Sequence, residues 1–218
     1  MTQHARILVA ISVLAFAACS SGSHAKASSP PAAPTAATET VLAIGGSATE
    51  GDGVRDRLQD AWPYIVFRDD LPSSAAFVNG ALDDATVAHA LATQAPLAKE
   101  LKPDIVEIWL GADDLVAATP IEAFTLTFTR LVETLRADGS RRILIGDLPA
   151  AYGTRTPQYN IAIHEITTTT HSELVPLAPL PVTLAPTDGL SPQPDEPAHR
   201  LIAAAFAREI TRAPRSRP

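Results

Sequence analysis

Beyond residue 40, short apolar runs alternate with stretches of helical periodicity, and this alternation limits the folds that the chain can adopt. The predicted strands lie at 41–44, 75–78, 104–110 and 142–146, and the third of them has a strongly apolar end. The helical stretches lie between and after them, at 54–67, 84–101, 120–137, 157–167 and 196–211. Parallel strands need such crossover helices between them. The pattern therefore predicts an α/β protein, a three-layer α/β/α sandwich with a parallel sheet of about five strands.

The first forty residues have the pattern of an export signal followed by a tether. Arg6 precedes an apolar stretch at 7–16, which is too short to span a bilayer. The run from Phe16 to Cys19 is similar to a bacterial lipobox, in which lipid is attached to the cysteine after cleavage before it. Residues 20–40 are rich in Ser, Ala and Pro and predict a flexible spacer. An ordinary signal peptide cleaved near Ala18 is the alternative.

These observations predict four segments: a signal peptide at 1–19, a tether at 20–40, a folded domain at 41–213 and a tail at 214–218. We expect an exported, extracytoplasmic protein that is anchored to the bacterial membrane through Cys19. Because Cys19 is the single cysteine, no disulfide within the chain can stabilise the fold.

The charge of the chain argues against a nucleic-acid partner. The net charge is −7, and beyond residue 40 there are 15 basic residues (17 less Arg6 and Lys26) against 23 acidic ones (24 less Glu39). Binding to a phosphate backbone depends on clustered Lys and Arg. We therefore expect no nucleic acid among the partners.

A glycine-rich turn with a serine, Gly45-Gly46-Ser47, follows the first predicted strand. Small residues allow a serine hydroxyl to be exposed on a tight strand-to-helix turn, although such a turn also serves as a plain N-cap. Binding sites of parallel sheets form at the carboxyl ends of strands. The other polar segments that follow predicted strands are 79–80, 111–114 and Asp147.

Several motifs stand in the order that is typical of one enzyme family. Residues 45–51 resemble the block Gly-Asp-Ser-x-Thr-x-Gly, with Gly46 in place of the aspartate. Four further segments are similar to Trp-Pro, Asn-x-x-x-x-Gly-x-Thr, Gly-x-Asn-Asp and Asp-Gly-x-His-Pro, and they stand at 62–63, 79–86, 111–114 and 188–192. His199-Arg200 resembles a Gly-His-Arg run that often follows. The chain thus resembles the SGNH/GDSL family of esterases and lipases over about residues 41–211, which implies a flavodoxin-like fold.

The resemblance implies a role for five positions. Ser47 stands where the family has its nucleophile and Asp188 where it has the aspartate that orients the base. At the other three positions the chain departs from the family: Asp84 replaces an oxyanion-hole glycine, Asp113 replaces an oxyanion-hole asparagine, and Ser191 replaces the base histidine.

These departures predict weak or absent esterase activity. Without an imidazole, Ser47 lacks a group that accepts its proton. An ionised carboxylate at Asp113 accepts hydrogen bonds and cannot donate them to an oxyanion. Our first hypothesis is a catalytically inactive or strongly impaired surface lipoprotein, whose ligand is a lipid or glycan ester. The alternatives are an atypical serine esterase that acts through Ser47 on acyl or acetyl esters of lipid or cell-envelope glycan, and an unrelated α/β binding module.

Other residues are weaker candidates for chemistry. The histidines of the folded part, His89, His164, His171 and His199, fit surface, cap or structural positions better than a replacement base. We expect no cofactor and no metal. If Asp84, Asp113 and Asp188 converged near Ser47, Ca²⁺ or Mg²⁺ would be the ions that suit them, but Asp84 also fits the N-cap of the helix that follows.

Overall fold

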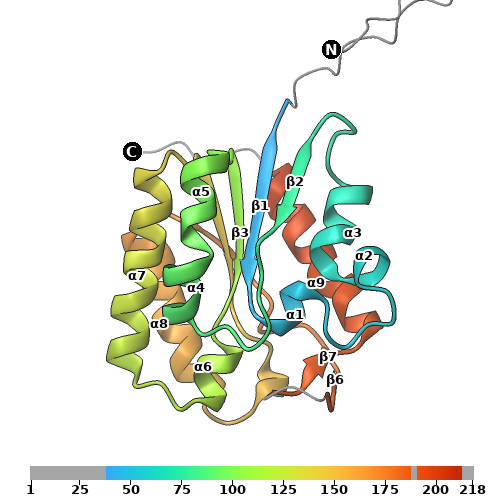
Figure 1. Ribbon diagram of the computed structural model, residues 1–218. Coiled ribbons are helices and arrows are strands. Elements are labelled where there is room, and N and C mark those ends of the chain that lie inside the picture. Colours follow the sequence, from blue (N-terminus) through green and yellow to red (C-terminus); the bar gives the residue numbers. More distant parts are fainter. Residues whose placement is uncertain (1–37, 188–190, 213–218) are drawn as a thin grey trace, which may run out of the picture. The chain divides into compact units, whose positions relative to one another are not determined.

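The computed structural model describes residues 38–187 and 191–212, which form a parallel five-stranded sheet between two layers of helices (Figure 1). The strand order is β2-β1-β3-β4-β5, and each neighbouring pair is parallel. The strands are β1 (Thr40–Gly45), β2 (Ala76–Asn79), β3 (Ile105–Trp109), β4 (Arg142–Gly146) and β5 (Glu173–Val175). This is the strand order of flavodoxin-like sheets. The predicted fold class is therefore confirmed.

Two layers of helices cover the sheet. The layer formed by α4, α5, α7 and α8 lies on one face, and α2, α3 and α9 lie on the other (Figure 1). The helices are α1 (Ser47–Glu50), α2 (Arg57–Asp60), α3 (Trp62–Asp69), α4 (Val87–Thr93), α5 (Ala95–Leu101), α6 (Ala112–Val116), α7 (Ile121–Ala137), α8 (Thr156–Thr169), α9 (Glu196–Thr211) and the 3-10 helix η1 (Ala150–Tyr152). Both faces of β1 and β3 are buried, which explains the apolar run of β1 and the apolar residues on either side of Glu107 in β3.

Two of the predicted helices are interrupted. The stretch 54–67 becomes α2 and α3, which meet at Ala61. The stretch 84–101 becomes α4 and α5, which meet at Gln94. The buried Gln94 side chain accepts a hydrogen bond from the Gly45 N–H (3.0 Å) and donates one to the Gly45 carbonyl (2.9 Å). These bonds satisfy the N–H and the carbonyl of Gly45 at the end of β1, and they explain why the helix is interrupted at Gln94.

The N-cap prediction at Asp84 is wrong. The N-cap of α4 is Thr86, whose hydroxyl accepts a hydrogen bond from the N–H of His89. The segment between β5 and α9 contains a short antiparallel pair, β6 (Leu184–Ala185) and β7 (Gln193–Pro194). Among the helices in the described ranges, none is long and apolar enough to cross a membrane.

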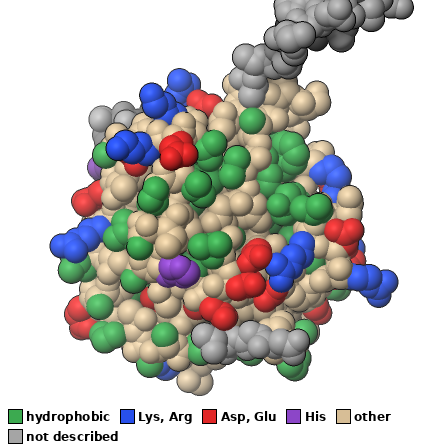
Figure 2. All heavy atoms as spheres, viewed as in Figure 1, with side chains coloured by type: hydrophobic (Ala, Val, Ile, Leu, Met, Phe, Trp, Pro, Cys, Tyr) green, Lys and Arg blue, Asp and Glu red, His purple; other side chains and the backbone are tan. Residues whose placement is uncertain are grey.

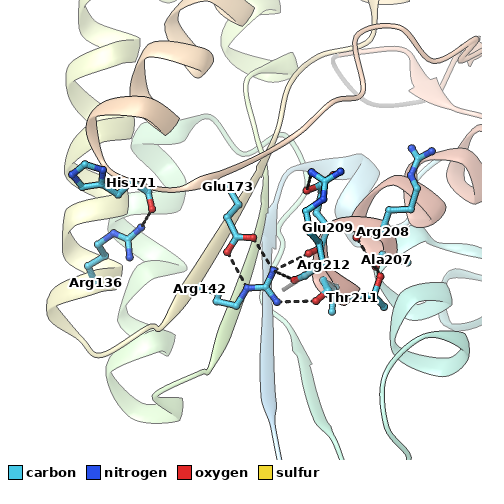
Figure 3. A network of polar contacts seen from close by, with 10 residues as sticks. Arg136, Arg142, His171, Glu173, Ala207, Arg208, Glu209, Thr211 and Arg212 are labelled. Atoms are coloured by element: carbon cyan, nitrogen blue, oxygen red, sulfur yellow. Dashed lines mark hydrogen bonds and ion pairs between the residues drawn. The ribbon is translucent and has the colours of Figure 1, made fainter. Parts of the chain in front are cut away.

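Arg142 joins three elements at the end of the sheet opposite the strand carboxyl ends (Figure 3). Its guanidinium donates to both carboxylate oxygens of Glu173, at 2.9 and 2.7 Å. It also donates to the carbonyls of Glu209 (2.7 Å) and Ile210 (2.8 Å) in the last turn of α9. The first residue of β4 therefore ties β5 and the C-terminal end of α9 together.

Candidate active site

Ser47 lies at the carboxyl end of β1, as the first residue of the short helix α1, and is almost fully buried. The turn is tight because the carbonyl of Gly46 accepts from the N–H of Glu50 (3.0 Å) and the Ser47 carbonyl accepts from the N–H of Gly51 (2.9 Å). A Cβ at Gly45 would lie 2.0 Å from the Thr49 hydroxyl oxygen. The glycine before the serine turn is therefore required by the close packing of Thr49.

The backbone of Asp84 contacts the serine directly. Its N–H donates to Ser47 Oγ at 2.9 Å. Asp84 has a φ of 53°, a left-handed conformation that glycine adopts at less cost than other residues. The conformation suited to the family's glycine is thus kept, and the N–H donor is in place although the side chain has changed.

Asp113 occupies the space beside Gly46. A Cβ at Gly46 would lie 2.3 Å from Asp113 Oδ2. With this backbone, any side chain at position 46 therefore requires the Asp113 carboxylate to move from its present position. The other carboxylate oxygen of Asp113, Oδ1, accepts a hydrogen bond from Ser191 Oγ at 2.9 Å.

Ser191 has its hydroxyl fully engaged. It donates to Asp113 and accepts from Gln193 Nε2 at 2.6 Å. Gln193 Nε2 also donates to the Ser191 carbonyl (3.1 Å). The residue at the position of the base histidine is thus held in a network in which it does not accept the proton of Ser47. Gln193 belongs to this site as well, although no sequence motif indicated it.

The acidity of Asp113 is shifted by its surroundings. Burial raises the pKa of Asp113 to about 6, and the nearby carboxylates of Asp84 and Asp114 contribute to the increase. The hydrogen bond from Ser191 opposes it. Asp113 therefore changes its charge within reach of neutral pH, and in its protonated form it can donate a hydrogen bond.

The space beside Ser47 is small. A cavity of about 10 Å³, room for one water molecule, is lined by Ser47, Trp109, Asp113, Leu148, Tyr152 and Gln193 among others. The Tyr152 hydroxyl is buried and has no hydrogen-bond partner among the described residues. Burial, with a smaller contribution from the Asp113 carboxylate, raises the pKa of Tyr152 above its usual value, so its O–H remains protonated.

A wider, acidic depression of about 700 Å³ lies beside the turn that carries Ser47. It is lined by Asp52, Gly53, Arg57, Asp83, Asp84, Pro186 and Thr187. Acidic side chains gather in the lower part of the face shown in Figure 2, beside a basic one. Burial, followed by the Asp83 charge, raises the pKa of Asp52. Within the described ranges, no three His, Cys, Asp or Glu residues are arranged to hold a metal ion.

His199 has a structural role in α9. It is fully buried, its Nδ1 accepts from the N–H of Trp62 (3.1 Å), and its Nε2 donates to the carbonyl of Asp52 (3.1 Å). Burial lowers the pKa of His199 to about 4, so the ring is neutral at pH 7. With both ring nitrogens engaged, His199 cannot accept the proton of Ser47.

The structure brings Ser47, the Asp84 backbone, Asp113 and Ser191 together. Asp188, expected to orient the base, lies outside the described residues, and so does Cys19. The structure also pairs His164 with Asp147, which lie 17 positions apart and were not expected to meet. Asp147 was singled out as the residue after a strand, but no local pattern indicated its partner.

A serine on the turn after β1 of this parallel sheet, with a backbone N–H bonded to its hydroxyl, is the arrangement expected of an α/β/α serine hydrolase. Residues 43–212 match the GDSL-like Lipase/Acylhydrolase family, and the chain belongs to this family. Ester-hydrolysing enzymes of the SGNH type are therefore its relatives by family and fold.

Solved structures agree with this assignment at the level of the fold. Esterase EstA from Pseudoalteromonas sp. is 22% identical, with a TM-score of 0.65, over 79% of this chain and 96% of its own. The acetylxylan esterase Axe2 from Geobacillus stearothermophilus, as a catalytic mutant, is 22% identical, with a TM-score of 0.66, over 85% and 100%. A lipase/acylhydrolase from Enterococcus faecalis is 20% identical, with a TM-score of 0.66, over 82% and 100%. No curated protein sequence matches the chain.

Proposed function

We propose that this protein is an exported, lipid-anchored member of the family that has lost ordinary esterase chemistry and acts as a binding or accessory protein at the cell surface. One observation carries the proposal: the residue at the base position, Ser191, donates its hydroxyl hydrogen to Asp113 instead of accepting a proton from Ser47. The class of ligand expected for such a protein is a lipid or glycan ester.

The lost base is the main argument. A serine hydroxyl is a weak nucleophile without an adjacent proton acceptor. The described hydrogen bond of Ser47 Oγ is one that it accepts from an N–H, which does not make it more nucleophilic. Loss of nucleophile or base function costs roughly 10⁶ in kcat in serine hydrolases.

The changed oxyanion position adds to this loss. In its ionised form, Asp113 places negative charge where the family has an asparagine donor. Loss of a single such donor costs about 10²- to 10³-fold in kcat. The effects of residues of one catalytic unit are not additive, so the combined loss is smaller than the product of the two factors.

The test is hydrolysis of p-nitrophenyl acetate by the purified protein beside Ser47→Ala. We expect equal background rates and no labelling of the native protein by a fluorophosphonate. The pair Asp113→Asn and Ser191→His should raise the rate by about 10²-fold or more, because it restores a donor and a base. Asp113→Asn with Ser191→Asn is the matched control, since it restores the donor alone. Native turnover that disappears with Ser47→Ala would contradict the proposal.

A second candidate, an atypical serine esterase acting on acyl or acetyl esters of lipid or cell-envelope glycan, is favoured by the Asp84 backbone. Its N–H is directed at Ser47 Oγ from a left-handed conformation, so one donor of an oxyanion hole is kept. Asp113, with its pKa raised to about 6, would then be the candidate proton acceptor. Fluorophosphonate labelling of Ser47 that increases between pH 5 and 7 would support this function, because the carboxylate must be ionised to accept a proton.

The anchor is tested separately from the chemistry. Mass spectrometry of the mature N-terminus from the membrane fraction should find a diacylglyceryl group on Cys19, and Cys19→Ser should move the protein out of that fraction. A mature chain that begins after Ala18 with an unmodified cysteine would contradict the anchor, and would leave the proposal on esterase chemistry as it stands.

A further inference from the structure

A second cavity, which is open at the surface and separate from the Ser47 pocket, lies beside α8. Its volume is about 360 Å³, within the range of small-molecule sites. Most of its lining is apolar or small, and the residues are Ala150, Gly153, Thr156, Pro157, Asn160, Ile161, His164 and Ala178. It adjoins the segments that follow β4 and β5, so it lies toward the sheet edge where parallel α/β proteins bind ligands.

The polar part of this cavity is a His-Asp pair. Asp147 is nearly fully buried, and its Oδ1 accepts from the N–H groups of Leu177 (2.6 Å) and Ala178 (2.7 Å). Its Oδ2 lies 2.9 Å from Nε2 of His164. The carboxylate is thus anchored by two backbone donors and fixes the imidazole ring of His164, as the carboxylate of a catalytic or metal site fixes its histidine.

The orientation of His164 leaves one nitrogen for a ligand. Because a carboxylate accepts at Nε2, this nitrogen carries the hydrogen of the neutral ring, and Nδ1 is a hydrogen-bond acceptor. Nδ1 has no hydrogen-bond partner in the part of the chain that the structure describes, and the side chain is 51% exposed. The ring is therefore held in one position with its acceptor unused.

The other polar wall residues differ in what they can offer. The side-chain amide of Asn160 is fully engaged, because its oxygen accepts from the N–H of Leu148 (2.8 Å) and its nitrogen donates to the Leu148 carbonyl (2.9 Å). Thr156 has a buried hydroxyl without a hydrogen-bond partner among the described residues. His164 is thus the polar group of the wall that is both fixed and exposed.

We propose that this cavity binds a small, neutral, apolar molecule that carries one hydroxyl group, an alkanol or a phenol, whose O–H donates to Nδ1 of His164. The apolar wall of Ala150, Pro157 and Ile161 would cover the hydrocarbon part. The ligand is neutral because the Asp147 carboxylate is already engaged by His164 and by the N–H groups of Leu177 and Ala178, so it is not available to pair with a charged ligand. The site needs no chemistry at Ser47, so it is independent of the proposed function.

The two cavities share one segment of the chain. Ala150 and Gly153 line the cavity beside α8, whereas Leu148 and Tyr152 line the Ser47 pocket. In addition, the Asp147 carbonyl accepts from Trp109 Nε1 at 3.2 Å, and Trp109 is part of the Ser47 pocket. A ligand beside α8 therefore contacts the same short stretch, including η1, that forms a wall of the other pocket.

The probe is 4-fluorophenol, observed by fluorine NMR during titration with the full-length protein. Fluorobenzene, which lacks the hydroxyl, is the matched compound. We expect saturable binding of 4-fluorophenol, about five- to tenfold weaker binding to His164→Phe, and no such loss for fluorobenzene. His89→Phe, a change of another exposed histidine on α4, is the matched control and should bind as the native protein does.

A second variant keeps the test decisive if loss of the Asp147 partner disturbs folding. Ile161 is 69% exposed, so Ile161→Trp should fold normally while narrowing the cavity and abolishing binding of both compounds. Leu126→Trp, at an exposed site of α7, is its control. Absence of saturable binding, or equal affinity of 4-fluorophenol for the native protein and both variants, would overturn the proposal.

Discussion

At the scale of single residues, Gly46 and Asp113 depend on each other. The first block of the family has an aspartate where this chain has Gly46, and the carboxylate of Asp113 fills the space beside it. The hydroxyl of Ser191 then completes the bonding of that carboxylate. The departures from the family at Asp113 and Ser191 therefore belong to one hydrogen-bond network. A single substitution does not restore the catalytic site of the family in such a network.

We expect Gly46→Ala to lower the free energy of unfolding by about 1–3 kcal/mol, because the new Cβ would overlap Asp113 Oδ2. Asp113→Ala removes the overlapping carboxylate, so Gly46→Ala should cost much less in that background. Urea denaturation of the two single variants and the double variant measures the coupling. Additive effects within about 0.5 kcal/mol would show that the two residues do not compete for this space.

At the scale of elements, Arg142 connects β4, β5 and α9 through side chains and backbone (Figure 3). The Arg142 and Glu173 side chains are 15% and 17% exposed. A partly buried, bidentate pair with further backbone acceptors contributes more than an exposed pair. This connection ties the C-terminal end of the last helix to the edge strand of the sheet.

Arg142→Met should destabilise the protein by about 2–4 kcal/mol, because Glu173 and the last carbonyls of α9 lose their donor while they stay partly buried. The matched control is Arg68→Met, which breaks an exposed pair with Asp69 and should cost at most about 1 kcal/mol. Midpoints of urea unfolding compare the two variants. Equal effects of both would mean that the Arg142 network adds no more than a surface ion pair.

At the scale of the whole molecule, one buried carboxyl makes stability depend on pH. Glu107 lies in the central strand β3, between Val106 and Ile108, and is fully buried. Neither of its carboxyl oxygens has a hydrogen-bond partner in the described residues. Burial raises the pKa of Glu107 from 4.5 to about 8, so the folded protein holds this proton at pH 7 while the unfolded chain does not.

Because the folded state binds the additional proton, stability should fall as pH rises from about 4.5 to 8. The loss contributed by Glu107 is on the order of 4 kcal/mol across this window. Glu107→Gln should be more stable than the native protein at pH 8 and should lose this part of the pH dependence. Denaturant unfolding at several pH values measures it, with the exposed Glu122→Gln as control. Parallel stability curves of Glu107→Gln and the native protein would contradict this account.

Several features of the protein followed from local pattern. The predicted strand at 142–146 and the predicted helix at 196–211 coincide with β4 and α9, because apolar runs and helical periodicity are properties of consecutive residues. The place of Ser47 after the first strand followed in the same way, since the carboxyl ends of parallel strands meet at one edge. The family resemblance indicated that positions 84, 113 and 191 differ from the glycine, asparagine and histidine that the family has there.

Other features depend on residues that are far apart in the chain, and no local pattern contains them. Gln94 divides a predicted helix because its side chain binds the backbone of Gly45, 49 positions away. Ser191 bonds Asp113 across 78 positions, and His164 is fixed by Asp147 beside a cavity whose walls come from three segments. The sequence by itself determined the alternation of the first four strands with helices and the placement of the serine turn, because these rest on periodicity and turn chemistry. Only the tertiary structure decided which polar side chains meet, because hydrogen bonding between distant residues depends on how the layers pack.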